Sequence, residues 1–169
     1  MDIRQVVGDV PFFAGALDDE HLDALAAGSR LVAFDPGAVV FEEDDNAVGT
    51  TMYVVVAGAF TVAVHDEGKA QEVATLTKGQ IFGEMSLLTG LPRLGTVTAG
   101  EGAEAIEIPF VTLKAMLSDS PALFERLAGM LQKRQGDLDQ IIDPGFWERH
   151  GRSPENLAWV MRRHFEETT

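Results

Sequence analysis

The chain has 169 residues, and 46% of them are apolar, which is enough to build a hydrophobic core and too many for a disordered protein. Its 27 acidic and 13 basic side chains give a net charge of −14, and residues 1–110 alone carry 18 acidic and 5 basic residues. Non-specific binding to nucleic acid and to anionic membranes depends on Lys and Arg. The charge therefore argues against nucleic acid and membrane surfaces as partners.

The sequence also excludes some classes of catalysis and indicates a cellular compartment. It contains no cysteine, which excludes disulfides and thiol catalysis and favours a cytoplasmic location. The amino terminus shows no signal-peptide pattern, and the longest apolar run, residues 52–64, is too short to cross a bilayer, so we expect no direct membrane insertion of this chain. The four histidines lack the spacing of metal ligands, and we expect neither a metal nor a cofactor.

Residues 1–30 are predicted to form an N-terminal helical segment. An acidic run at residues 18–20 precedes apolar residues at helical spacing, and Gly28 follows them. This pattern predicts a short helix with an acidic amino-terminal cap.

From residue 31 to residue 110 the sequence changes to short β-rich runs separated by Gly, Pro and Asp. The runs predict strands at residues 31–34, 38–41, 52–56, 59–64, 72–76, 95–98 and 105–108. Most of these runs have no helix between them, which disfavours a parallel α/β fold. We therefore predict an α+β, mainly β fold: an antiparallel jelly-roll barrel flanked by an N-terminal helix and C-terminal helices.

Residues 111–143 are predicted to form hinge and lid helices. A short helix is expected around Leu113, and a longer one begins with Ser120 as its N-cap and Pro121 at its first position and runs to residue 142. Residues 144–169 are predicted as a tail with a helix from Ser153. The apolar stripe of the long helix extends past what the barrel needs, so a homodimer contact is a further hypothesis.

Residues 79–97 stand apart from the other segments between strands. Gly83 permits a close backbone approach, and residues 84–88 can form one helical turn whose free N–H groups suit an anion. Arg93, predicted to enter the next strand, and Lys78 are the only basic residues between positions 70 and 113. Arginine can bind phosphate oxygens through two N–H groups, and the Glu84 carboxylate can accept a hydrogen bond from a sugar hydroxyl. A structural ion pair between Glu84 and Arg93 is the alternative interpretation.

The sequences FGEMSLL at residues 82–88 and PRLGTV at residues 92–97 resemble the phosphate-binding cassette of cyclic nucleotide-binding domains. That family includes the regulatory subunit of cAMP-dependent protein kinase, the catabolite activator protein and bacterial cyclic nucleotide-gated channels. Residues 34–41 and 52–58 resemble the first strands of the family. The resemblance extends over about residues 11–142.

The resemblance implies roles for the cassette residues. Glu84 would accept a hydrogen bond from the ribose 2′-hydroxyl, and Arg93 would bind the cyclic phosphate, assisted by backbone N–H groups near Ser86 and Leu94. The ribose side would be lined by Gly83 and Met85.

The resemblance also implies a base pocket and a lid. The base would contact Val62, Val73 and Ala74, and the helix after the barrel would cover it through Arg134, Gln135 and Leu138. Members selective for cGMP carry Thr directly after the cassette arginine, whereas this chain has Leu94 there. The resemblance therefore favours cAMP over cGMP, with cGMP as a second possible ligand.

Departures from the family pattern keep other functions open. Gly95 replaces a small Ala, and residues 43–46 replace the usual Gly-Asp turn; we expect the acidic residues 42–45 to form a solvated loop. The first hypothesis is a non-enzymatic sensor in which ligand binding moves the C-terminal helices and signals to an effector or channel domain. The tail resembles that of bacterial channels with this domain. The alternatives are a protein-interaction module that binds no nucleotide and a cupin-like enzyme.

Overall fold

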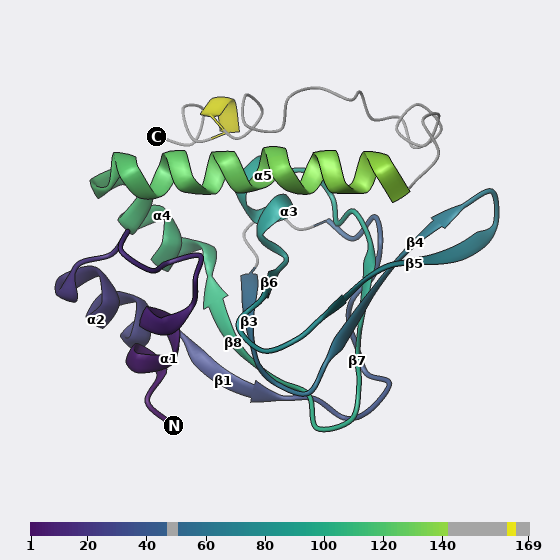
Figure 1. The fold of residues 1–169 in the computed structure, drawn as a ribbon, viewed down its shortest axis with the longest axis horizontal. Helices are drawn as coiled ribbons and strands as arrows, with labels where there is room; N and C mark the ends of the chain where they lie inside the picture. The colour runs from purple at the N-terminus through teal and green to yellow at the C-terminus, as the bar shows by residue number, and fades with distance from the viewer. Residues whose placement is uncertain (47–50, 142–161, 165–169) are drawn as a thin grey trace.

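The computed structural model describes residues 1–46, 51–141 and 162–164, without the side chain of Leu138. Figure 1 shows a body of β-strands with two helices at one end, α1 (Ile3–Asp9) and α2 (Asp19–Gly28), and the long helix α5 (Pro121–Ile141) lying across the top. No helix in the described part of the chain is long and apolar enough to span a membrane.

One arginine bridges the two N-terminal helices, which also share a hydrophobic cluster. Helix α2 confirms the predicted acidic cap, because the carboxylate of Asp18 accepts a hydrogen bond from its first turn. Helix α1 was not predicted; the side chain of Asp2 caps it. The guanidinium of Arg4 in α1 lies 2.6 Å from carboxylate oxygens of both Asp19 and Asp23 in α2.

The strands form two four-stranded antiparallel sheets. The first has the order β1-β8-β3-β6 and consists of β1 (Arg30–Ala33), β8 (Glu104–Pro109), β3 (Thr51–Ala57) and β6 (Ile81–Phe82). The second has the order β2-β7-β4-β5 and consists of β2 (Val39–Phe41), β7 (Thr96–Ala99), β4 (Phe60–Asp66) and β5 (Lys69–Leu76). The mainly β class and the antiparallel pairing are confirmed. Within the described residues the strands divide into two sheets and do not close into one barrel.

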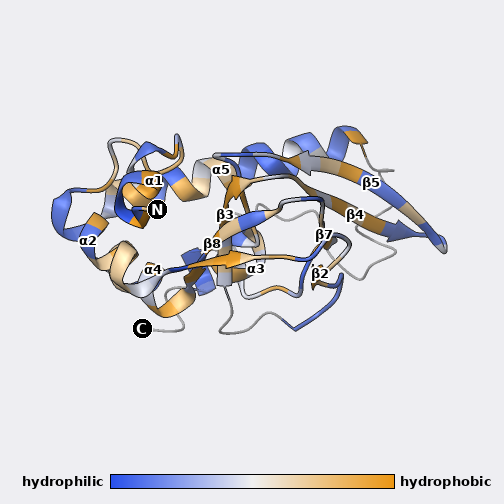
Figure 2. Cartoon of the chain, turned by 90° about the horizontal axis from the view of Figure 1, so that it is seen from below, coloured by the Kyte–Doolittle hydropathy of each residue, from blue (hydrophilic) through white to orange (hydrophobic). Residues whose placement is uncertain are grey.

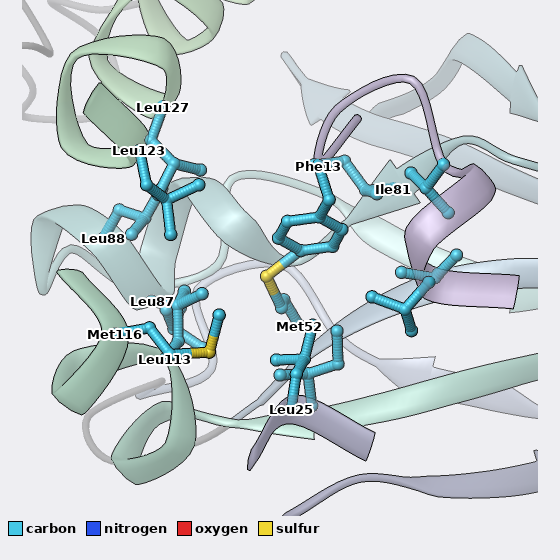
Figure 3. Close-up of a cluster of buried hydrophobic side chains, with 14 of the residues drawn as sticks. Phe13, Leu25, Met52, Ile81, Leu87, Leu88, Leu113, Met116, Leu123 and Leu127 are labelled. Atoms are coloured by element: carbon cyan, nitrogen blue, oxygen red, sulfur yellow. The ribbon is translucent and has the colours of Figure 1, made fainter. Parts of the chain in front are cut away.

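Strand β3 is buried on both faces and separates two hydrophobic clusters. Its residues alternate: Tyr53 and Val55 join the cluster between the two sheets, whereas Met52 and Val54 join a second cluster beneath the helices. Figure 3 shows the second cluster, in which Met52 lies among side chains from the N-terminal segment, the short helix α3 (Glu84–Thr89) and the C-terminal helices. The helices therefore cover the outer face of the first sheet.

The C-terminal helices match the predicted pattern. Helix α4 (Phe110–Asp119) is followed by Ser120, whose Oγ accepts a hydrogen bond from the N–H group of Leu123 at 3.2 Å and so caps α5. The first half of α5 buries Leu123, Leu127 and Leu131, while Figure 2 shows that its second half is mostly hydrophilic. The predicted tail helix lies outside the described residues, except for residues 162–164, which are helical.

Candidate functional site

The candidate site begins where β6 turns into the short helix α3 (Glu84–Thr89). Phe82 ends β6, and its ring centroid lies 4.9 Å from those of Tyr53 and Phe60, so the start of the turn is fixed in the core. Gly83 then adopts φ 81°, in the left-handed region that favours glycine. A Cβ atom at Gly83 would lie 2.9 Å from Nη1 of Arg93. Glycine therefore permits both the turn and the close approach of Arg93.

Glu84 is wholly buried although it is a carboxylate. Nη1 of Arg134, from helix α5, lies 2.6 Å from Oε1 of Glu84, and Nη2 of Arg134 donates to the carbonyl of Ile81 at 2.5 Å. Neither carboxylate oxygen of Glu84 accepts a well-aligned hydrogen bond from another residue in the described part of the chain. A buried oxygen without a donor is costly, so Glu84 retains the capacity to accept one from a bound molecule.

The surroundings of Glu84 shift its protonation equilibrium. Burial raises the pKa of the Glu84 carboxyl, and the positive charges of Arg134 and Arg93 oppose this shift. The alternative interpretation of the sequence, a structural ion pair between Glu84 and Arg93, is not what the structure contains: the partner of Glu84 is Arg134.

Arg93 is also buried, with 3% of its surface exposed. Its Nη1 donates to the carbonyl of Gly83 at 2.9 Å, and its Nη2 donates to the carbonyl of Thr51 at 3.1 Å. The guanidinium carbon lies 4.0 Å from the centroid of the Phe41 ring, a cation–π contact. Burial lowers the pKa of Arg93, while nearby acidic groups oppose that change, and a guanidinium remains charged in proteins. A fixed cation is thus presented beside Glu84.

The main chain of Arg93 is held by the acidic loop. The N–H group of Asp44 donates to the carbonyl of Arg93 at 2.8 Å, and the N–H group of Arg93 donates to the carbonyl of Asp45 at 3.0 Å. Arg93 therefore lies before β7, which starts at Thr96, so the prediction that Arg93 enters the strand is wrong. The loop positions the arginine by backbone pairing.

The expectation of a solvated loop at residues 42–45 is wrong for Glu43. Its side chain is 7% exposed, and its Oε2 accepts a hydrogen bond from the main-chain N–H group of His65 at 2.7 Å. Oε2 also lies 3.1 Å from Nδ1 of that histidine. Glu43 thereby joins the acidic loop to β4.

A pocket of about 70 Å³ lies between the two buried charges. It brings together eight of the residues predicted for the site: Val62, Gly83, Glu84, Met85, Ser86, Arg93, Leu94 and Arg134. The lining also includes residues that the sequence did not single out for the site: Phe41, Phe82, Gly95 and Val97. The pocket therefore has three charged groups, those of Glu84, Arg93 and Arg134, on otherwise mostly apolar walls.

Four of the residues predicted for the site are not among the described residues that line this pocket. Val73 and Ala74 are half-buried in β5 and do not line this pocket, and neither does Gln135 of α5. The side chain of Leu138 is outside the described part of the structure. Arg134 was expected to cover the base, whereas here it pairs with Glu84 on the cassette side.

A larger hollow of about 350 Å³ lies elsewhere, between α1 and residues 78–79. Its charged residues, Asp2, Asp9 and Lys78, are exposed, and none is buried against an opposite charge. Volume alone does not mark a site, so the smaller pocket with its buried Glu84 and Arg93 is the stronger candidate.

Comparison with known families agrees with this geometry. The family model described as "Cyclic nucleotide-binding domain" matches residues 31–120, which is more than half of the chain. The chain belongs to the cyclic nucleotide-binding domain family. The match extends from the second residue of β1 through β8 and helix α4, and it includes the whole cassette at residues 79–97.

Relatives of this domain occur in proteins of several kinds. A cyclic nucleotide-gated potassium channel of Rhizobium etli is 30% identical over 132 residues, covering 78% of this chain and 35% of the channel. The cAMP-dependent protein kinase type II regulatory subunit of Drosophila melanogaster is 30% identical over 126 residues, covering 75% of this chain and 30% of the subunit. The chain thus spans about a third of the length of these curated relatives.

Solved structures of the family share the fold. The regulatory domain of Toxoplasma gondii PKA, crystallised with cAMP, superposes with a TM-score of 0.62 at 23% identity, covering 68% of this chain and 43% of that one. The sensor domain of the transcriptional regulator DNR from Pseudomonas aeruginosa gives a TM-score of 0.66 at 20% identity, covering 78% and 91%. At these identities the likeness demonstrates the fold alone.

Proposed function

We propose that this domain binds a cyclic nucleotide, cAMP in preference to cGMP, and converts binding into a movement of helix α5. One observation carries the proposal: a buried carboxylate and a buried guanidinium, Glu84 and Arg93, line the same pocket on a mostly apolar wall. A cyclic nucleotide offers a matching pair of groups, a ribose hydroxyl that donates and a phosphate that carries negative charge. The domain acts without chemistry, as a regulatory module.

The two polar contacts have defined directions. The ribose 2′-hydroxyl donates to Glu84, whose oxygens lack an aligned donor, and the phosphate oxygens accept from Arg93. Short-range contacts must provide the affinity, because the net charge of residues 1–110 repels an anion at long range and salt screens it beyond about 8–10 Å.

Binding requires helix α5 to move. The pocket holds about 70 Å³, whereas pockets for small ligands measure about 300–1,000 Å³. Arg134 lines it from α5 and already pairs with Glu84. A ribose at Glu84 would displace Arg134 from that position, so ligand and helix are coupled through one carboxylate. The ligand can shift α5 only to the extent that it binds more tightly to the state in which the helix has moved.

The preference for cAMP rests on Leu94. This residue lines the pocket directly after the cassette arginine, where members selective for cGMP carry a threonine. A leucine has no hydroxyl for the polar edge of guanine. The free energy of burying that edge without a partner disfavours cGMP.

Isothermal titration of the full chain with cAMP, cGMP and 5′-AMP tests the proposal. We expect binding of cAMP to be tighter than that of cGMP, and 5′-AMP to bind most weakly because its open phosphate does not fit the cyclic geometry. Arg93→Ala should weaken cAMP binding by about tenfold or more, since removing one partner of a desolvated charge pair costs several kcal/mol. The matched control is Arg30→Ala, which removes the same side chain from an exposed pair with Glu107.

The outcomes separate the candidates. Absence of heat with every nucleotide, in a folded protein, would reject nucleotide sensing and favour the second candidate, a protein-interaction module that binds no nucleotide. The contracted pocket and the internal Arg134–Glu84 pair support that second candidate. Binding that is unaffected by Arg93→Ala would reject the site assignment only. The names of the relatives support an effector such as a channel or kinase as the partner of α5.

A further inference from the structure

The end of the described chain packs on the same elements that surround the site. Nη2 of Arg162 lies 2.8 Å and 2.9 Å from the two carboxylate oxygens of Glu125 in α5, and its guanidinium carbon lies 5.3 Å from the ring centroid of Phe124. Figure 1 shows this segment, residues 162–164, beside the first half of α5. The two oxygens share the single Nη2 donor, and the ring contact adds a second attachment of Arg162 to α5.

His164 extends the contact to the two other helices. Its ring centroid lies 6.1 Å from that of Phe110, the first residue of α4. The ring also covers Gly90, the left-handed C-cap of α3: a Cβ atom at Gly90 would lie 2.8 Å from Cε1 and Nδ1 of His164. Three helices therefore form one receiving surface, made of Gly90, Phe110, Phe124 and Glu125.

We propose that this surface is a docking site for residues 162–164 of the chain itself, and that docking opposes nucleotide binding. The segment joins α3, which begins with Glu84, to α5, which carries Arg134. When the segment is docked, it favours the arrangement in which Arg134 pairs with Glu84. A nucleotide that displaces Arg134 must shift α5 against this attachment. The coupling rests on the proposed function, whereas the docking itself does not.

Charge reversal tests the docking. Arg162→Glu and Glu125→Arg are made singly and together in the full chain, with Lys69→Glu, an exposed residue of the β4–β5 hairpin, as the matched control. Amide hydrogen exchange is followed in residues 84–90 and 121–128. We expect faster exchange in both single variants, recovery in the double variant and no change in the control. Exchange equal to the wild type in the single variants, or no recovery in the double variant, overturns the docking.

Titration with cAMP tests the coupling on the same proteins. Each single variant should bind about two- to fivefold more tightly, the range that one exposed ion pair supports, and the double variant should return to the wild-type affinity. Unchanged or weaker affinity in variants whose exchange shows release overturns the coupling. If the wild type binds no nucleotide, the proposed function fails, and the exchange experiment still decides whether residues 162–164 dock.

Discussion

Nη1 of Arg134 lies 2.6 Å from Oε1 of Glu84, and it joins a helix covering the site to the most deeply buried carboxylate of the described chain. The same guanidinium donates to the carbonyl of Ile81. This one side chain therefore links the position of α5 to the charge of the pocket. It pairs with the carboxylate that, in the proposed function, accepts a hydrogen bond from the ribose.

Replacing Arg134 by alanine should destabilise the fold. The change leaves Glu84 buried without its partner, and breaking such a pair costs about 3–5 kcal/mol when both ions are buried. Because the Arg134 side chain is 28% exposed, we expect a smaller loss of about 1–3 kcal/mol in urea unfolding at pH 7. Lys133→Ala, on an exposed neighbour in α5, serves as the control. Equal stability of the two variants would contradict the role of the pair.

Replacing Glu84 by glutamine should change how stability depends on pH. Burial raises the pKa of Glu84 above its ordinary value of 4.5. The folded protein therefore binds a proton more tightly than the unfolded chain. The stability that this provides is complete below pH 4.5 and is lost as the pH rises through the folded-state pKa.

The glutamine variant lacks this loss, so its stability relative to the wild type should increase from pH 4.5 upward and then level off. Denaturant titrations across this range measure the difference. The same variant should bind cAMP more weakly, because an amide is a poorer acceptor than a carboxylate for the ribose hydroxyl. Parallel pH profiles of the two proteins would show that the ionisation of Glu84 does not affect folding.

Phe41→Leu should affect the ligand more than the fold. The substitution removes the ring beneath the Arg93 guanidinium, a contact worth about 0.5–2 kcal/mol. We expect cAMP affinity to fall several-fold, because Arg93 loses part of its fixed orientation. Phe34→Leu is the matched control: Phe34 contacts Tyr53 and Phe60 in the same cluster. It should lower the melting temperature without lowering the affinity.

Gly83→Ala should cost about 1–3 kcal/mol of folding stability, since the residue has a positive φ and its new methyl group meets the Arg93 side chain and the Thr51 carbonyl. Gly79→Ala separates these causes. Gly79 also has a positive φ, of 86°, but no atom lies within 4 Å of its hypothetical Cβ. Thermal unfolding should therefore show a larger loss for Gly83→Ala than for Gly79→Ala, and equal losses would refute the steric contribution.

Strong local patterns were readable from the sequence. Ser120 and Pro121 marked the start of α5, and alternation with turn residues marked most strands, because caps and turns depend on neighbouring residues. Helix α1 escaped prediction because its β-branched residues and Gly8 favour a helix weakly, and because its bridge from Arg4 reaches residues far along the chain. Strand β6 has two residues, too few for a period.

The sequence predicts the lining residues that belong to one contiguous motif, but not the contacts that distant segments make with them. Glu84 and Arg93 lie in one motif, and both line the same pocket. Phe41 lies more than fifty residues from Arg93, and nothing local ties that ring to the guanidinium. The partner of Glu84 was likewise hidden, because Arg134 reaches it only through the packing of α5 on the core. Such pairs depend on the packing of segments that are distant in the sequence, which no local pattern encodes.

The backbone pairing of Arg93 with Asp44 and Asp45 has a kinetic consequence. Main-chain atoms make these two bonds, so the acidic loop positions the arginine through its backbone. An anion that approaches Arg93 still meets the net negative charge of residues 1–110. Added salt should accordingly speed the association of a cyclic nucleotide, the reverse of what oppositely charged partners show.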